Sequence, residues 1–304
     1  MKWQIKALIQ NLISLLPTVM STKVYFYIQK KFGRLQSIEY LITTRLVAAV
    51  SIWEKIQKSN KDPINKSFYE LGSGKTPILP ISLWLMGAKN IISIDKESYF
   101  NETLFFEFID YLKENKKKIN YLLNNKIDNS RFEKLYEINF SKKTNIKRQI
   151  KEYFNIDLIS TEKKGINLNN KYLVDFYISY SVLEHINKKI INKILYESFF
   201  MLKNDGLQIH FIDYSDHYAQ TDKSITRFNF YKYSDFFWSI YSSNMFTYVN
   251  RFRHDDFLTL FKDNNLKIID EEIFIDKKFE NFLEHNKIYK RFFSKDNKIL
   301  SILS

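Results

Sequence analysis

Apolar residues near the start of the chain recur at helical spacing, at Ile5, Leu8, Ile9, Leu12, Leu15 and Leu16. This spacing predicts a helix that Pro17 ends or kinks. A second helical pattern, residues 40–56, stops at the polar residues 59–63. We therefore expect a helical extension over residues 1–62. Its first helix is interpreted as packing on the main domain, with a basic amphipathic helix on a membrane surface as the alternative.

From Ser67 onward, short apolar runs alternate with helical patterns. A strand at 68–71 is followed by a glycine turn, a helix at 80–85 and a strand at 90–94 that ends at Asp95. This order predicts a βαβ unit of a parallel sheet, and hence an α/β fold.

The same alternation continues to residue 276. It predicts strands at 156–160, 174–179, 207–212 and 266–269 and helices at 183–201 and 253–264. We expect one main domain over 63–276, which contains a helical insertion at 113–155 and a cap at 214–252. A C-terminal segment follows at 277–304.

The turn after the first strand carries a recognisable chemistry. Gly72 and Gly74 let backbone N–H groups approach a ligand closely. Glu70 would repel a pyrophosphate and suit a cation such as S-adenosylmethionine, which disfavours NAD. Asp95 lies 95 − 74 = 21 residues after Gly74, where an acid accepts hydrogen bonds from ribose hydroxyls.

These residues resemble the motifs of class I S-adenosylmethionine-dependent methyltransferases. Residues 70–74 (ELGSG) are similar to their motif I, 91–95 to their second strand, 175–186 to the fourth strand and following helix, and 202–206 to the turn before the fifth strand. The resemblance implies a Rossmann-like, mostly parallel seven-stranded sheet with helices on both faces. It also implies S-adenosyl-L-methionine as cofactor, bound by Glu70, Gly72, Ser73, Gly74, Asp95 and Ser179.

The chain departs from the family pattern in two places. Thr76, followed by Pro77, replaces the third glycine of motif I. The long stretch between Asp95 and Asp175 leaves the adenine-contacting residue unassigned, with Asp157 and Thr161 as candidates.

The loop after the fifth strand holds a dense group of titratable residues. His217 is predicted to be the general base for methyl transfer, oriented by Asp213 or Asp216. A polar loop without catalytic function is the alternative. The same residue types also suit a divalent metal, but no third acid follows at helical spacing, and we expect no metal site.

Residues that would contact the acceptor lie after the fourth strand and in the cap. We predict His185, Arg227, Asn229, Asn250 and Arg251. Arginines and amides among aromatic residues suit a sugar or another small polar molecule, with aromatic packing as the alternative. The cap also resembles that of bacterial sugar-modifying methyltransferases.

Charge and composition add only weak constraints. The formal net charge is +13, which makes an RNA methyltransferase an alternative, although no compact arginine cluster or zinc knuckle is present. Cysteine is absent, which excludes disulfides and thiolate metal sites. We expect a cytoplasmic enzyme, with a non-catalytic protein that keeps the cofactor-binding fold as another alternative. The oligomeric state stays open.

Overall fold

The computed structural model describes residues 1–96, 99–141, 144–161 and 172–304. The helices and strands, in chain order, are α1 (Trp3–Ser14), α2 (Thr18–Phe32), α3 (Ile38–Lys58), β1 (Ser67–Leu71), α4 (Ile78–Leu85), β2 (Asn90–Asp95), α5 (Glu102–Glu114), α6 (Lys116–Leu122), α7 (Asn129–Glu137), α8 (Ile146–Phe154), β3 (Ile156–Ser160), β4 (Val174–Tyr180), α9 (Lys188–Met201), β5 (Leu202–Phe211), α10 (Asp235–Ser242), α11 (His254–Asp263), α12 (Lys278–His285) and α13 (Asn297–Ser301). Short 3₁₀ turns include η2 (Leu183–His185), η3 (His217–Gln220) and η4 (Asn229–Lys232).

The chain divides into two compact units. The first, which we call the sheet unit, consists of Gln29–Tyr180 and Phe200–His210. The second, which we call the aromatic unit, consists of Met1–Ile28, Ser181–Phe199 and Phe211–Ser304. Each unit is described separately below.

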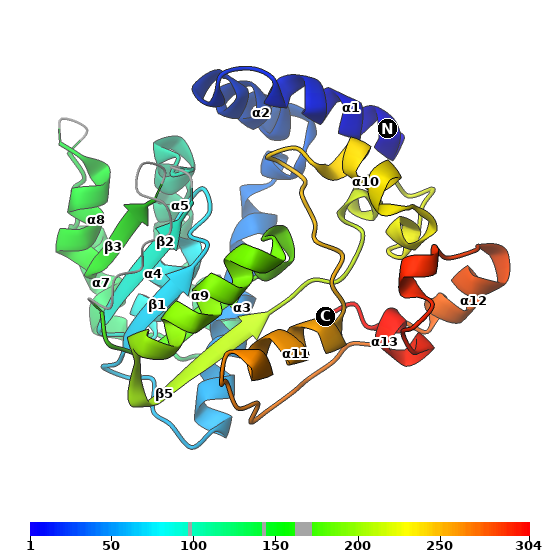
Figure 1. Ribbon diagram of the computed structural model, residues 1–304. Helices are drawn as coiled ribbons and strands as arrows, with labels where there is room; N and C mark the ends of the chain where they lie inside the picture. The colour runs from blue at the N-terminus through cyan, green and yellow to red at the C-terminus, as the bar shows by residue number, and fades with distance from the viewer. Residues whose placement is uncertain (97–98, 142–143, 162–171) are drawn as a thin grey trace. The chain divides into compact units, whose positions relative to one another are not determined.

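The described residues of the sheet unit form a sheet of five strands in the order β3-β2-β1-β4-β5 (Figure 1). β1 pairs in parallel with β2 and with β4, and β2 pairs in parallel with β3. All five residues of β1 are buried, as expected for the central strand of a parallel sheet. This arrangement confirms the predicted α/β class, and the carboxyl end of β1 lies beside the switch in strand order.

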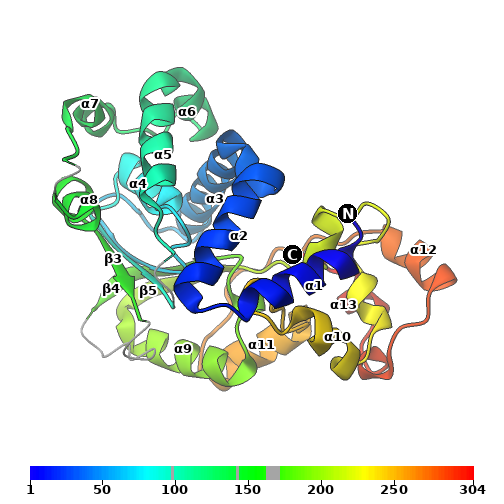
Figure 2. The same cartoon turned by 90° about the horizontal axis from the view of Figure 1, so that it is seen from above.

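Helices pack on the strands and on one another in this unit. Every residue of α4 is buried, and α4 contacts both α3 and β2. Viewed from above, α3, α4 and α5 lie together on one side of the strands (Figure 2). Because α4 is apolar all round, it can be stable only inside such a layer.

Most predicted elements are found in the structure. The strands expected at 68–71, 90–94, 156–160, 174–179 and 207–212 correspond to β1 to β5. The stretch 113–155 holds α6, α7 and α8, while its residues 142–143 lie outside the described residues.

Three local predictions differ from the structure. Residues 266–269, all described, form no strand, because they pair with no neighbouring strand and Ile269 is 61% exposed. The helix expected from 183 begins only at Lys188, after the turn η2. The turn expected at 202–206 is instead the beginning of β5, which starts at Leu202. α2 lies inside the expected helical extension 1–62, although no separate helix was assigned to its residues. The sixth and seventh strands of the sheet stay a prediction.

Aromatic side chains dominate the core of the aromatic unit. Trp3 is 2% exposed, and its ring lies 5.0 to 5.9 Å from four other aromatic rings. Its backbone N–H donates to Oδ2 of Asp222 at 2.8 Å. The buried cluster consists of Trp3, Ala7, Tyr218, Phe228, Phe230, Tyr231, Trp238, Phe279, Phe282, Phe292, Leu300 and Leu303. The first helix is therefore part of this core, as the sequence favoured.

The opposite face of α1 is apolar and exposed. Leu8, Leu12 and Leu15 are 50%, 67% and 82% exposed. The neighbouring helix α10, which contacts α1, exposes Phe236 and Ile240. Among the described residues, no helix has both the length and the apolarity needed to cross a membrane.

Candidate functional site

The glycine turn of the sheet unit lies at the carboxyl ends of β1 and β2. Gly72 has φ +91° and Gly74 has φ +65°, a left-handed region that favours glycine. The N–H groups of Gly72 and Ser73 donate to the carbonyl of Ile94 at 2.7 and 3.2 Å. The N–H of Gly74 donates to Oδ2 of Asp95 at 2.9 Å. The two motifs predicted to act together are therefore in direct contact.

The turn tolerates the loss of the third family glycine. Thr76 is not among the described residues with positive φ, so its backbone accepts a side chain without strain. Pro77 then occupies the N-cap position of α4. Proline suits the start of a helix because its missing N–H would have no partner there.

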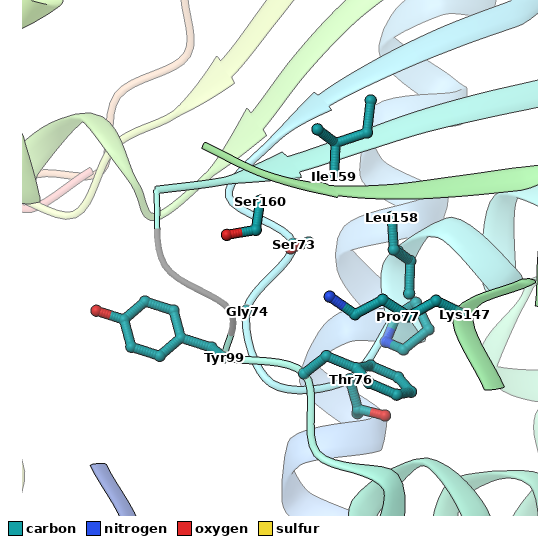
Figure 3. Close-up of a pocket in the computed structure, with 10 residues that line it drawn as sticks. Ser73, Gly74, Thr76, Pro77, Tyr99, Lys147, Leu158, Ile159 and Ser160 are labelled. Atoms are coloured by element: carbon teal, nitrogen blue, oxygen red, sulfur yellow. The ribbon is translucent and has the colours of Figure 1, made fainter. Parts of the chain in front are cut away.

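A pocket opens beside this turn (Figure 3). Its walls come from the glycine turn, the end of β3 and the segments around 99–100 and 147, and the residues are Ser73, Gly74, Thr76, Pro77, Tyr99, Phe100, Lys147, Leu158, Ile159 and Ser160. The hydroxyls of Thr76 and Ser160 are buried and have no hydrogen-bond partner among the described residues. A Cβ added at Gly74 would meet nothing within 4 Å. The pocket thus combines unused hydroxyls with open space next to a glycine.

Glu70 lies on β1, two residues before the turn. It is 3% exposed and accepts a hydrogen bond from the hydroxyl of Ser93 on β2. Burial raises the pKa of Glu70 to about 7, while the Ser93 hydroxyl and the charge of Arg45 act in the opposite direction. A cationic ligand near Glu70 would favour its ionised form.

Ser179 on β4 lies beside Leu71 in the sheet, immediately before the turn. Its Oγ lies 2.8 Å from Nδ1 of His210, and Nε2 of His210 lies 3.0 Å from Oε1 of Gln208. Because the amide oxygen can only accept, Nε2 carries the proton and Nδ1 accepts from Ser179. The sequence predicted Ser179 as a site residue but assigned no role to His210, because strand pairing brings together residues 31 positions apart. Burial lowers the pKa of His210 to about 4.

Of the two adenine-contact candidates, Asp157 forms an ion pair with Lys151 at 2.6 Å. The backbone N–H of Thr161 donates to the carbonyl of Asp95 at 3.0 Å. Neither side chain lines the pocket, whereas the neighbouring residues 158–160 do.

Titratable residues predicted to be catalytic gather in the aromatic unit. Nε2 of His217 lies 3.3 Å from Oδ2 of Asp213. The rings of His185 and His217 lie 4.9 Å apart. Glu184 accepts a hydrogen bond from the backbone N–H of Asp213 at 3.4 Å. The structure thus brings His217, Asp213 and His185 together, and adds Glu184, which sequence reading missed.

These groups perturb one another. Burial raises the pKa of Glu184 to about 8, against the opposing charge of His217. Burial also acts to raise the pKa of Asp213, but the hydrogen bond and charge of His217 lower it to about 2. For His217, the interactions with Asp213 and Glu184 outweigh burial and raise the pKa. The pair of His217 and Asp213 therefore favours an imidazolium beside a carboxylate.

Asp216, the other predicted orienting acid, is 1% exposed and faces a different set of partners. Its Oδ1 accepts the N–H of Tyr218, and its Oδ2 accepts from the amide of Asn229 at 3.0 Å. Burial raises the pKa of Asp216 to about 6. These hydrogen bonds indicate a structural role for Asp216 and Asn229.

Most of the remaining residues predicted to contact the acceptor form hydrogen bonds or ion pairs within the aromatic unit. The amide of Asn250 donates to the carbonyls of Leu183 and Ile186, both at 2.8 Å, and holds the turn η2. Arg251 is 3% exposed, donates to the carbonyl of Tyr233 and pairs with Asp235. Arg227 is exposed. The roles of these residues in acceptor binding stay predictions.

Comparisons with known proteins match solved structures at low sequence identity and low TM-score. No protein-family model matches the sequence, and no curated protein matches it. The YcgJ protein from Bacillus subtilis has a TM-score of 0.41 and 11% identity over 75% of this chain and 72% of its own. The plantazolicin methyltransferase BpumL, solved with SAH, has a TM-score of 0.35 and 14% identity over 68% of this chain and 61% of its own.

Coclaurine N-methyltransferase, bound to N-methylheliamine and SAH, has a TM-score of 0.39 and 10% identity over 84% of this chain and 61% of its own. The present chain thus spans less than two thirds of either named methyltransferase. In its strand order and in the positions of Gly72, Gly74 and Asp95, the chain is similar to class I S-adenosylmethionine-dependent methyltransferases.

Proposed function

We propose that this protein is an enzyme that transfers a methyl group from S-adenosylmethionine to an oxygen or nitrogen of a small polar acceptor. The hydrogen bond from Gly74 to Asp95 is the observation that carries the proposal. It sets a carboxylate next to a glycine turn at the carboxyl ends of parallel strands, where ligands of such sheets bind.

The described residues fit this cofactor. Asp95 would accept hydrogen bonds from the ribose hydroxyls, and the open side of Gly74 would admit the ligand backbone. Tyr99, Phe100 and the hydroxyl of Ser160, which line the pocket beyond the turn, would contact the adenine. Glu70 would face the cationic portion. When bound, the cofactor supplies an electrophilic methyl group on a positively charged sulfur.

The charge of the site disfavours NAD. A pyrophosphate at the turn would lie close to Glu70, whose carboxylate would oppose it. The methionine part of S-adenosylmethionine instead presents an ammonium group and a sulfonium. An ionised Glu70 would be stabilised by that charge, which offsets the burial that raises its pKa.

For the acceptor, we propose a sugar or similar polar molecule. His185 and Arg227 are exposed and therefore accessible to an acceptor. The net charge of +13 supports RNA as the alternative acceptor. Measuring acceptor affinity at increasing salt concentration distinguishes the two, because affinity for RNA falls steeply as salt rises, whereas affinity for an uncharged sugar does not.

We also propose that the aromatic unit contacts an anionic lipid surface through α1. Its exposed leucines form an apolar stripe beside the exposed Phe236 and Ile240 of α10. Residues 1–28, which belong to this unit, hold no acidic residue and three basic ones: Lys2, Lys6 and Lys23. An apolar stripe in an acid-free, basic segment is typical of helices that lie in a bilayer interface.

Calorimetric titration with S-adenosylmethionine and S-adenosylhomocysteine tests the cofactor, with NADH as the comparison ligand. We expect micromolar binding of both sulfur nucleosides and a loss of at least about tenfold in Asp95→Ala, in line with about 1.4 kcal/mol per tenfold change. Asp110→Ala, which changes an exposed acid on α5 of the same unit, should bind normally. A folded sample that binds neither sulfur nucleoside would contradict the proposal.

A further inference from the structure

Glu184, His185 and His217 form a compact group of metal-ligand side chains in the aromatic unit. One ligand atom from each residue lies within 4.8 Å of the other two. Nitrogen and oxygen ligands bind zinc-like ions at about 2.0–2.2 Å, so three ligands of one ion can be mutually separated by at most about 3.8 Å. Side-chain shifts of well under an ångström would bring these three atoms onto a common ion.

Neighbouring residues orient the two imidazoles. Nδ1 of His185 lies 2.7 Å from the carbonyl of Tyr248, which can only accept, so Nδ1 carries the proton and Nε2 keeps its lone pair. The carboxylate of Asp213 lies beside the ring of His217. Metal-binding histidines are commonly oriented by a carbonyl or carboxylate that accepts from the ring nitrogen not bound to the metal.

The backbone around the group is also fixed. Asn250 donates its backbone N–H to the carbonyl of Glu184 at 2.9 Å, and its side chain binds both ends of the turn η2. Glu184 and His185 are therefore presented from a turn that is held in place before any ligand arrives.

An independent observation points to a cation. Glu184 is 2% exposed, and its Oε2 has no hydrogen-bond partner among the described residues. Its other oxygen accepts the backbone N–H of Asp213 at 3.4 Å. A buried carboxylate with an unused oxygen is unfavourable unless a proton or a cation compensates it. The imidazolium of His217 described above, or a metal ion bound in place of its proton, would do so.

The ligand set indicates the class of ion. Two imidazoles and one carboxylate suit Zn²⁺, Co²⁺, Mn²⁺ or Fe²⁺, whereas Mg²⁺ and Ca²⁺ prefer oxygen ligands alone. The chain has no cysteine, so no thiolate elsewhere in it competes with these three residues for the ion. His185 is exposed, so water or an acceptor oxygen can reach the remaining coordination positions.

We propose that Glu184, His185 and His217 bind one divalent transition-metal ion, with positions left open for an oxygen of the acceptor. Metal binding itself does not depend on the proposed methyl transfer, while the contact with the acceptor rests on it. The proposal competes with the sequence-based assignment of His217 as general base, because a histidine that binds a metal through its free nitrogen cannot also accept a proton there.

Cobalt titration of the full chain, without an affinity tag and after removal of metals by a chelator, tests the site. We expect one equivalent of Co²⁺ to produce visible absorption bands that Zn²⁺ abolishes. Replacing a residue that contacts a metal ligand, but not the metal, typically weakens metal binding roughly 10–100-fold. Glu184→Gln, His185→Ala and His217→Ala each remove a proposed ligand and should weaken Co²⁺ binding by more than that. Asp213→Asn, a positioning change, should fall within that range.

His285→Ala is the matched control, since His285 lies on α12 and is exposed. It should leave Co²⁺ binding unchanged. Circular dichroism would establish that each variant is folded, and Glu184→Gln keeps the side-chain shape. Absence of saturable binding, or equal weakening in His285→Ala, would overturn the proposal and leave His217 as the candidate base. Calorimetry with S-adenosylmethionine separates this result from a failure of the cofactor assignment.

Discussion

The backbone N–H of Gly74 donates to the carboxylate of Asp95, 21 residues further along the chain. This bond connects the turn after β1 to the last residue of β2. It fixes the position of one carboxylate oxygen at the turn. The parallel register of β1 and β2 is what brings the two residues together.

Gly74→Ala should separate stability from cofactor binding. An alanine at the left-handed φ of +65° should lower the free energy of unfolding by about 1–2 kcal/mol. This loss is due to the backbone conformation alone, because the added Cβ meets no atom within 4 Å. Binding of S-adenosylmethionine should fall further, because the methyl group occupies the space proposed for the ligand. Urea unfolding and calorimetry measure the two effects.

Gly87→Ala provides the control for this variant. Gly87 also has positive φ, at +109°, and an added Cβ there meets Ile64 only at ordinary contact distance. We expect a similar loss of stability with unchanged affinity for the cofactor. Equal affinity losses in both variants would show that the effect at Gly74 is only a general destabilisation.

Glu70→Gln should change stability and binding in opposite directions. Because burial raises the pKa of Glu70 to about 7, its contribution to stability is fully present below about pH 4.5 and is lost as pH rises through 7. Above pH 7 the variant should therefore be more stable, by on the order of 3 kcal/mol at most. Unfolding curves between pH 5 and 8 should diverge as pH rises.

Binding of S-adenosylmethionine to Glu70→Gln should weaken, since the variant lacks the charge proposed to face the ammonium group. Glu114→Gln changes an exposed position on α5 and is the control. It should change the free energy of unfolding by less than about 0.5 kcal/mol and leave the affinity for the cofactor unchanged. A Glu70→Gln variant that binds the cofactor as tightly as the parent would remove Glu70 from the site.

Arg253→Leu should strongly destabilise the aromatic unit. Arg253 is fully buried, donates to the carbonyls of Tyr214 and Ile302, and packs over the ring of Tyr231. Hydrogen bonds to charged groups contribute about 1.5–3 kcal/mol each, so the loss of two predicts about 3 kcal/mol or more. Arg148→Leu, at an exposed ion pair on α8, should cost less than about 0.5 kcal/mol. Thermal unfolding distinguishes the two outcomes.

Replacing Leu12 and Leu15 by glutamate should abolish attachment to vesicles that contain anionic lipid. Burying each leucine in the interface contributes about 1.5–3 kcal/mol, so the double variant should bind at least about a hundredfold more weakly. Flotation measures this directly. Phe293→Glu, which changes another exposed apolar residue of the aromatic unit, should float normally. No flotation of the parent chain would contradict the membrane proposal.

The sequence predicted the glycine turn and the acid that contacts it because both depend on local patterns. Residues Gly72, Gly74 and Asp95 sit at the ends of strands, and strand ends follow from periodicity and glycine positions. Glu184 was not predicted because nothing in its local pattern indicates that it is buried without a partner for one oxygen.

The acceptor predictions illustrate a second limit. Arginine and asparagine suit both ligand binding and internal hydrogen bonds, so residue type does not distinguish the two. Arg251 reaches carbonyls around η4, and Asn250 holds η2. The strand expected at 266–269 shows the same limit for the backbone, because a strand requires a partner that periodicity does not provide.

The burial of Trp3 has a consequence for the order of folding. Its hydrogen bond to Asp222 spans 219 residues, so the core around it can close only after nearly the whole chain has left the ribosome. The long segment Gln29–Tyr180 of the sheet unit is synthesised much earlier. During that interval the apolar first helix lacks its partners, and such exposed segments are prone to aggregation. We therefore expect synthesis of this protein in cells to depend on chaperones that protect its first twenty or so residues.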